Sequence, residues 1–189
     1  MTNLEKVYHS LQNKINEPYK DYPLDFKKRK CFQNILNAQF LLYLIQGYSL
    51  AVYDKEVFSE DILYLKDRIL ILELEANFIY NIKTLKQDYC FENIIIDEYQ
   101  EEAINFVVKI YGGVYAHDLN EIINSHDPVI FDKYEATNIE QVIKKENIKS
   151  YFKQNFEKIF NNKENKKWIL NNHHQKILKK LLIPKHFPE

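Results

Sequence analysis

The chain has 189 residues and a formal net charge of −1, and 46% of its residues are apolar. These values are typical of one globular domain, and they exclude disorder for most of the chain. Three glycines and two cysteines exclude a glycine-rich phosphate loop, a disulfide framework and a paired-cysteine metal site. The N-terminus has no basic and then apolar signal sequence, so we expect a cytoplasmic protein.

Charge is distributed unevenly along the chain. Residues 62–140 contain 15 acidic and 6 basic residues, whereas residues 144–185 contain 3 acidic and 12 basic residues. This asymmetry has two interpretations: a basic tail that contacts a partner, or a basic tail that folds over an acidic body.

The first 30 residues predict a helix and a connector. Residues 3–16 place their apolar side chains on one face, and Thr2 with Glu5 forms a capping-box pattern. Residues 17–30 are predicted to be a connector that contains the basic run 27–30. Such a run could touch phosphate, but it is more typical of a solvated helix entry.

Residues 33–52 form the most apolar stretch, and they predict a helix buried on most sides in a globular core. The stretch is barely long enough to span a membrane. Polar side chains, which are costly in lipid, also interrupt it at Asn37, Gln39, Gln46 and Ser49. We therefore expect no membrane insertion.

The middle of the chain mixes strand and helix signals. Residues 54–64 fit a loop or a short β-hairpin beside the core helix. Residues 69–74 fit either a short buried strand or the start of a helix, and helical spacing predicts a helix over about 70–86.

The second half predicts further helices. Asp97 and Gln100 form an N-cap pattern before a helix over 98–111, and a shorter helix follows over 116–124. Residues 139–161 predict one or two helices whose apolar residues, Val142 among them, point inward.

After a polar break, residues 165–182 predict a C-terminal amphipathic helix with one apolar face and with Lys176, Lys179 and Lys180 around the rest of its surface. The predicted fold class is therefore mainly α. It comprises an N-terminal helix and connector (1–32), a helical domain (33–160) with a short hairpin, and a basic C-terminal helix or tail (161–189).

No residue pattern indicates a catalytic, cofactor or metal site. The pairs His117-Asp118 and His126-Asp127 suggest a metal-dependent hydrolase, but a two-metal site needs several such ligands to converge from different helices. Asp127 precedes a proline, where aspartate commonly serves as a turn or cap residue. We therefore interpret both pairs as structural.

Aromatic residues are abundant, with 14 tyrosines and 12 phenylalanines. Aromatic residues mixed with lysines are typical of surfaces that bind single-stranded nucleic acid. However, Tyr43, Phe78, Phe106, Phe152 and Phe156 have core spacing. Tyr8, Tyr48 and Tyr111 fit the core edge, with a solvated hydroxyl.

The order of these segments resembles the Panacea domain, which includes SocA-like antitoxins and phage-associated GepA-type proteins. Residues 111–129 are similar to the family's Tyr-Gly helix end and the Leu-x-x-Leu helix after it, and residues 146–156 to its closing helix. The first part of the resemblance is carried by Leu41-Leu42-Tyr43, Gln46-Gly47, Leu50-Ala51 and residues 57–62. The family's Trp and Gly-Pro-Val turn are replaced by residues 65–70, its Thr-His by Ile123-Asn124, and its Trp after proline by Val129.

The resemblance implies a non-enzymatic helical antitoxin that neutralises a protein toxin by binding it. SocA-like members also act as adaptors that deliver a toxin to a protease. We expect the predicted C-terminal helix to make the contact, through Leu170, Ile177, Leu178 and Leu181. Docking of this helix on its own body is the alternative. A second hypothesis is nucleic-acid binding through the basic tail.

Overall fold

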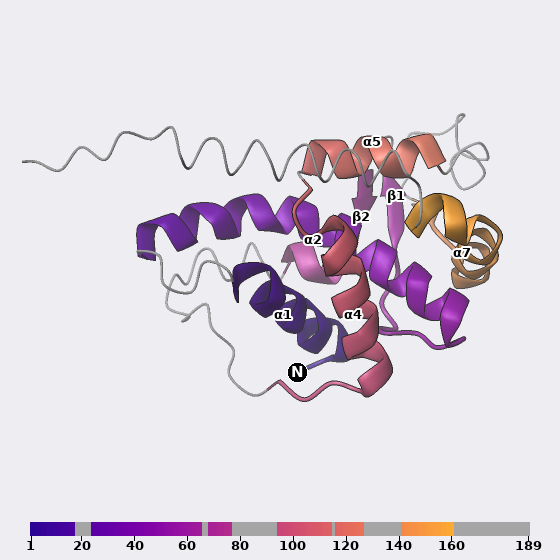
Figure 1. Cartoon of the computed structure of the whole chain (residues 1–189), viewed down its shortest axis with the longest axis horizontal. Coiled ribbons are helices and arrows are strands. Elements are labelled where there is room, and N and C mark those ends of the chain that lie inside the picture. The colour runs from indigo at the N-terminus through magenta and orange to yellow at the C-terminus, as the bar shows by residue number, and fades with distance from the viewer. Residues whose placement is uncertain (18–23, 66–67, 77–93, 115, 127–140, 161–189) are drawn as a thin grey trace, which may run out of the picture.

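The computed structural model describes residues 1–17, 24–65, 68–76, 94–114, 116–126 and 141–160 (Figure 1). In these residues the protein is mainly helical with one small sheet, which confirms the predicted fold class. The predicted C-terminal helix lies outside the described residues. The elements are α1 (Asn3–Asn16), α2 (Leu24–Val52), β1 (Leu63–Leu65), β2 (Arg68–Leu70), α4 (Glu98–Tyr111), α5 (Ala116–His126), β3 (Gln141–Val142) and α7 (Lys145–Phe160).

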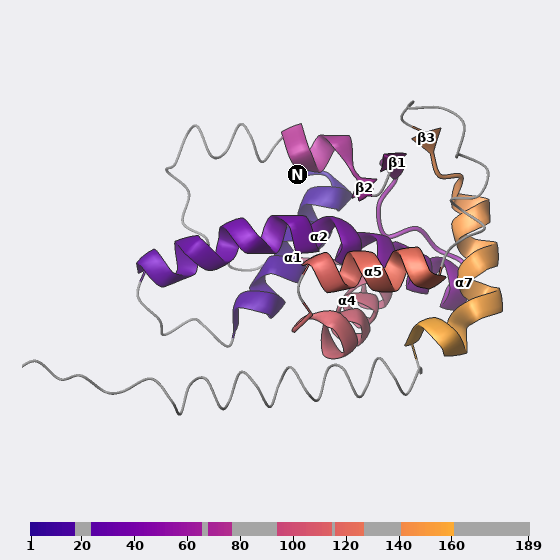
Figure 2. The ribbon, with the colours of Figure 1, turned by 90° about the horizontal axis from the view of Figure 1, so that it is seen from above.

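Helix α2 is the centre of the fold. Helices α1, α4, α5 and α7 all pack against it, and Figure 2 shows α5 lying over α2. Every residue from Ala38 to Leu50 is buried, as the apolar stretch predicted. The part of the chain that the structure describes contains no helix with the length and apolar character needed to cross a membrane.

Helix α1 begins as its sequence predicted. The Thr2 hydroxyl accepts a hydrogen bond from the Glu5 N–H (3.2 Å), and the Thr2 N–H donates to the Glu5 carboxylate (2.7 Å). This reciprocal pair satisfies two N–H groups at the helix start. The buried residues Leu4, Val7 and Leu11 place α1 in the same core as α2.

The predicted connector over 17–30 is too long, because α2 already begins at Leu24. The basic run 27–30 therefore belongs to the first turns of this helix. Lysine and arginine are good helix formers, so the run extends the helix toward its N-terminus.

The hairpin lies further along the chain than predicted. Residues 54–62 form a loop, and the antiparallel pair is β1 with β2, in which Leu63 faces Leu70. β3 pairs with the other edge of β1, which gives the strand order β2-β1-β3. Residues 72–76 then start a helix, so the segment from residue 69 is strand first and helix afterwards.

The described part of the second half follows its local signals except over residues 141–144, which were predicted to be helical and are not. Helix α4 has its predicted bounds, and the Asp97 N–H donates to the Gln100 side chain at its start (2.9 Å). α5 begins as predicted and extends to His126. Val142, predicted inward on a helix, is instead 46% exposed on β3. Its segment pairs with β1, and a local apolar pattern does not encode such a pairing.

Candidate interaction surface

The loop after α2 takes its shape from side chains of two helices. Gln46 of α2 is fully buried; its amide donates to the Phe58 carbonyl (3.1 Å) and accepts from the Val57 N–H (2.9 Å). Gln100 of α4 donates to the Val57 carbonyl (2.8 Å). These bonds satisfy backbone groups that a hairpin would otherwise pair, which explains why the loop contains no strand.

Acidic side chains of this loop form ion pairs with lysines of α7. Lys145 and Lys149 are one turn apart and pair with Glu56 (2.7 Å) and Asp54, respectively. The Lys149 ammonium lowers the pKa of Asp54, and Lys153 adds to this effect. The lysine row of α7 therefore faces acidic groups of its own chain, which weakens it as a phosphate-binding surface.

A surface of partly exposed apolar side chains lies where α2, α4 and α7 meet. We call it the aromatic strip. Its rings form a connected series, with centroids 6.1 Å apart for Tyr53 and Tyr99 and 6.5 Å apart for Phe106 and Phe156. The buried ring of Tyr48 joins these two pairs, at 6.2 Å from Tyr53 and 4.4 Å from Phe106. The aromatic strip consists of Tyr53, Tyr99, Phe106, Ile110 and Phe156.

Acidic side chains border the aromatic strip at the N-terminal end of α4. Glu98 and Glu102 are exposed there, where the helix dipole favours negative charge. Glu101, which is also exposed, instead pairs with Lys14 of α1 (3.9 Å). Burial and a hydrogen bond with Glu102 raise the pKa of Tyr53 above its ordinary value.

One cation already lies against the aromatic strip. The Lys55 ammonium is 5.0 Å from the centroid of the Tyr99 ring, within the range of a cation–π contact. An apolar surface with an acidic border fits an amphipathic helix whose polar side carries lysines.

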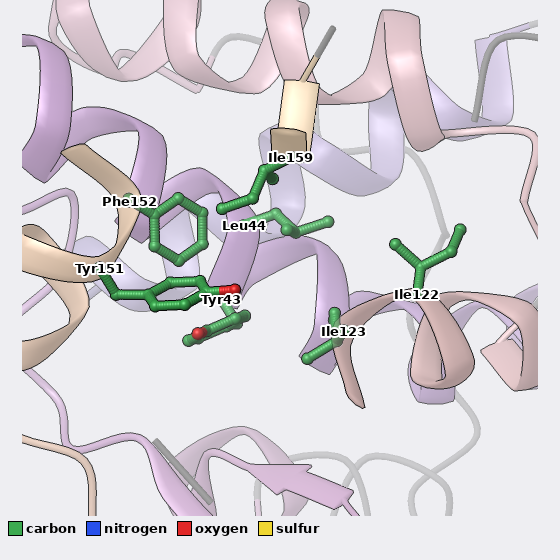
Figure 3. A pocket seen from close by; sticks show the side chains of 7 residues that line it. All are labelled: Tyr43, Leu44, Ile122, Ile123, Tyr151, Phe152 and Ile159. Atoms are coloured by element: carbon green, nitrogen blue, oxygen red, sulfur yellow. The ribbon is translucent and has the colours of Figure 1, made fainter. Parts of the chain in front are cut away.

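The core cavity in Figure 3 is too small for a substrate. Its lining is apolar apart from two tyrosines. The volume in which the centre of a water molecule fits is only about 10 Å³. This corresponds to at most one water molecule. The lining residues are Tyr43, Leu44, Ile122, Ile123, Tyr151, Phe152 and Ile159.

His117 and His126, the histidines of the two predicted His–Asp pairs, are far apart. His117 Nδ1 lies 3.8 Å from Asp118 and 3.5 Å from Glu121, and the His117 and Glu121 side chains are 79% and 70% exposed. His126 is nine residues later on the same helix. That spacing is about 13 Å along the helix axis, too far for both histidines to bind one ion. Asp127 lies outside the described residues.

The aromatic predictions are only partly confirmed. Tyr43 and Phe152 are buried, but Phe106 and Phe156 are only partly so, and Phe78 lies outside the described residues. Tyr111 was predicted to have a solvated hydroxyl, and this is wrong. It is fully buried and its hydroxyl donates to the Ile159 carbonyl.

The residues predicted to contact a partner, Leu170, Ile177, Leu178 and Leu181, lie outside the described residues. Sequence reasoning found the capping role of Gln100 but missed its bond to Val57 and the bonds of the buried amides Gln39 and Gln46. An amide inside an apolar stretch is the signal that could have found Gln39 and Gln46, since a buried amide must bond to some other group.

Comparison with known proteins adds no relative: no family model, no curated protein and no solved structure matches the chain.

Proposed function

We propose that this chain is an antitoxin-like protein that binds and neutralises a protein toxin. One observation supports the proposal: the separate segments on which the resemblance to the Panacea domain rests meet in one core. Gly47 of the first segment packs against the Phe152 ring of the last. Tyr111, which opens the middle segment, bonds to the backbone of Ile159, beside the last segment. Because these segments pack against one another, the motifs that resemble the Panacea domain belong to one folded core.

A binding role also fits how the buried polar side chains are used. Gln39 accepts from the Ile71 N–H (2.8 Å), and Gln46 and Gln100 hold the loop after α2. These amides maintain the shape of the fold, while the aromatic strip and its acidic border present binding chemistry at the surface.

The proposed contact to the toxin is the predicted C-terminal helix, through Leu170, Ile177, Leu178 and Leu181. An amphipathic helix that places one apolar face in a groove is a common recognition mode. In an adaptor variant of this function, the bound toxin would be presented to a protease.

The experiment is affinity capture of the tagged chain from its native lysate, followed by identification of stoichiometric partners. The proposal requires a partner that stops growth when expressed alone and is harmless when co-expressed with this chain. A stoichiometric partner that is harmless when expressed alone would contradict it, as would capture of no partner.

Matched variants test the contact. Leu178→Lys with Leu181→Lys places two charges on the apolar face, and we expect it to abolish protection from the toxin. Asn172→Lys with Gln175→Lys places the same charges on the opposite face and should preserve protection. Equal effects of the two pairs would refute a contact through the apolar face.

Nucleic-acid binding through the basic tail is the alternative function. The charge of the tail favours it, and it predicts binding that weakens steeply as salt rises. A gel-shift titration with DNA and RNA at low salt decides: retardation that disappears at higher salt supports this alternative, and no retardation eliminates it.

A further inference from the structure

We propose that in the free protein the predicted helix 165–182 docks on the aromatic strip, with its lysines against the acidic border of α4. This inference concerns the same tail as the proposed function. It requires no toxin, so the purified chain alone tests it. It assigns the aromatic strip an occupant, which is the chain's own C-terminal segment.

The described chain ends beside the strip. The ring of Phe160, the last residue of α7, lies 5.4 Å from that of Phe106 and 5.0 Å from that of Phe156, between centroids. Tyr111, at the end of α4, lies 6.3 Å from the same ring. Residues 161–164 can span at most about 14 Å, which is enough to turn the chain back over α4 and makes the predicted helix start near the strip.

Helix α4 and the predicted helix 165–182 are similar in length. Helix α4 has 14 residues, which makes it about 21 Å long, and the 18 residues of the predicted helix extend about 27 Å. If the predicted helix starts near Phe160, it passes Ile110 and Phe106 and ends beside the acidic first turns of α4.

The charges agree in position as well as in sign. Glu98 and Glu102 are exposed and four residues apart on α4. Lys176 and Lys180 are also four residues apart and lie on one flank of the predicted helix. In an antiparallel arrangement, Lys176 lies over Glu102 and Lys180 over Glu98. Leu170, Ile177 and Leu181 then face the strip.

The test is backbone hydrogen exchange of the purified full chain at low salt, measured by mass spectrometry. We expect amides of residues 170–181 to exchange at least ten times more slowly than in an unstructured chain. Glu98→Lys with Glu102→Lys should remove this protection, and adding Lys176→Glu with Lys180→Glu should restore it. Amides of α2 serve as the control that each variant folds.

A matched control reverses two charges elsewhere. Glu121→Lys on α5 with Glu146→Lys on α7 changes exposed acids away from the strip, and it should leave the tail protected. Exchange of the tail at the unstructured rate in the unaltered chain would overturn the proposal. So would protection that survives reversal of Glu98 and Glu102. Protection that increases with protein concentration would also overturn it, because a second copy would then be the occupant.

Discussion

Gly47 is the position where the packing of α2 against α7 has least tolerance. A methyl group added there would lie less than 3.0 Å from three carbons of the Phe152 ring. Phe152 is 1% exposed, and its ring is surrounded by those of Tyr43 (5.3 Å), Tyr151 (5.9 Å) and Phe160 (6.0 Å). The cavity beside it holds at most one water, which leaves the ring little space to move.

We therefore expect Gly47→Ala to destabilise the protein although alanine favours helix. The gain in helix propensity is up to about 1 kcal/mol. Overpacking of a filled core costs about 1–3 kcal/mol, and three overlapping ring atoms place this case at the upper end. The net loss in unfolding free energy is then about 2 kcal/mol, or a fall of roughly 4–8 °C in melting temperature for a chain of this size.

The measurement is chemical denaturation of a double-mutant cycle with Phe152→Leu. A smaller side chain at position 152 makes room for the methyl group, so the two substitutions together should cost at least ~1 kcal/mol less than the sum of their separate costs. If Gly47→Ala proves as stable as the unaltered chain, the reasoning about this contact is refuted. If the two costs simply add, the loss does not arise from the Phe152 ring.

Three further predictions concern single side chains. Gln46→Leu leaves two buried backbone groups of the loop without partners, and denaturation should show a loss of about 2–5 kcal/mol; a loss under ~1 kcal/mol would contradict the role of this amide. Burial lowers the pKa of His9, so the unfolded chain binds the proton more readily and stability falls as the pH drops below the usual value of 6.5. Between pH 7.5 and 5.5 the melting temperature should fall less for His9→Gln than for the unaltered chain; an equal fall in the two proteins would refute this. Asp54 has a left-handed backbone (φ 58°), which asparagine tolerates better than alanine. Asp54→Ala should therefore melt lower than Asp54→Asn, and the reverse order would exclude backbone strain as the cause.

Several local features of the fold could be predicted from sequence because the signals act within a few residues. The Thr2 and Glu5 pattern defines the start of α1 through bonds between neighbours in the chain. Asp97 and Gln100 define the start of α4 in the same way, through a bond between residues three positions apart. A continuous apolar stretch identified the buried part of α2, since a helix that is apolar on all sides is buried in a core.

The candidate surface was not predictable, because its parts come from distant positions. Tyr53 follows α2, whereas Phe106 lies on α4 and Phe156 on α7, and only packing brings their rings together. The burial of the Tyr111 hydroxyl depends likewise on the Ile159 carbonyl, 48 residues away.

Secondary structure also depended on such contacts in two places. The sequence left residues 54–62 open between a loop and a short hairpin; they form a loop, in which Gln46 and Gln100 bond to the backbone of Val57 and Phe58. Val142 lies on a strand because β1 offers an unpaired edge to its segment. The sequence by itself determined the helices through local spacing and caps. Only the tertiary structure decided the loop, the third strand and the aromatic strip, because each depends on hydrogen bonds or ring contacts between residues far apart in the chain.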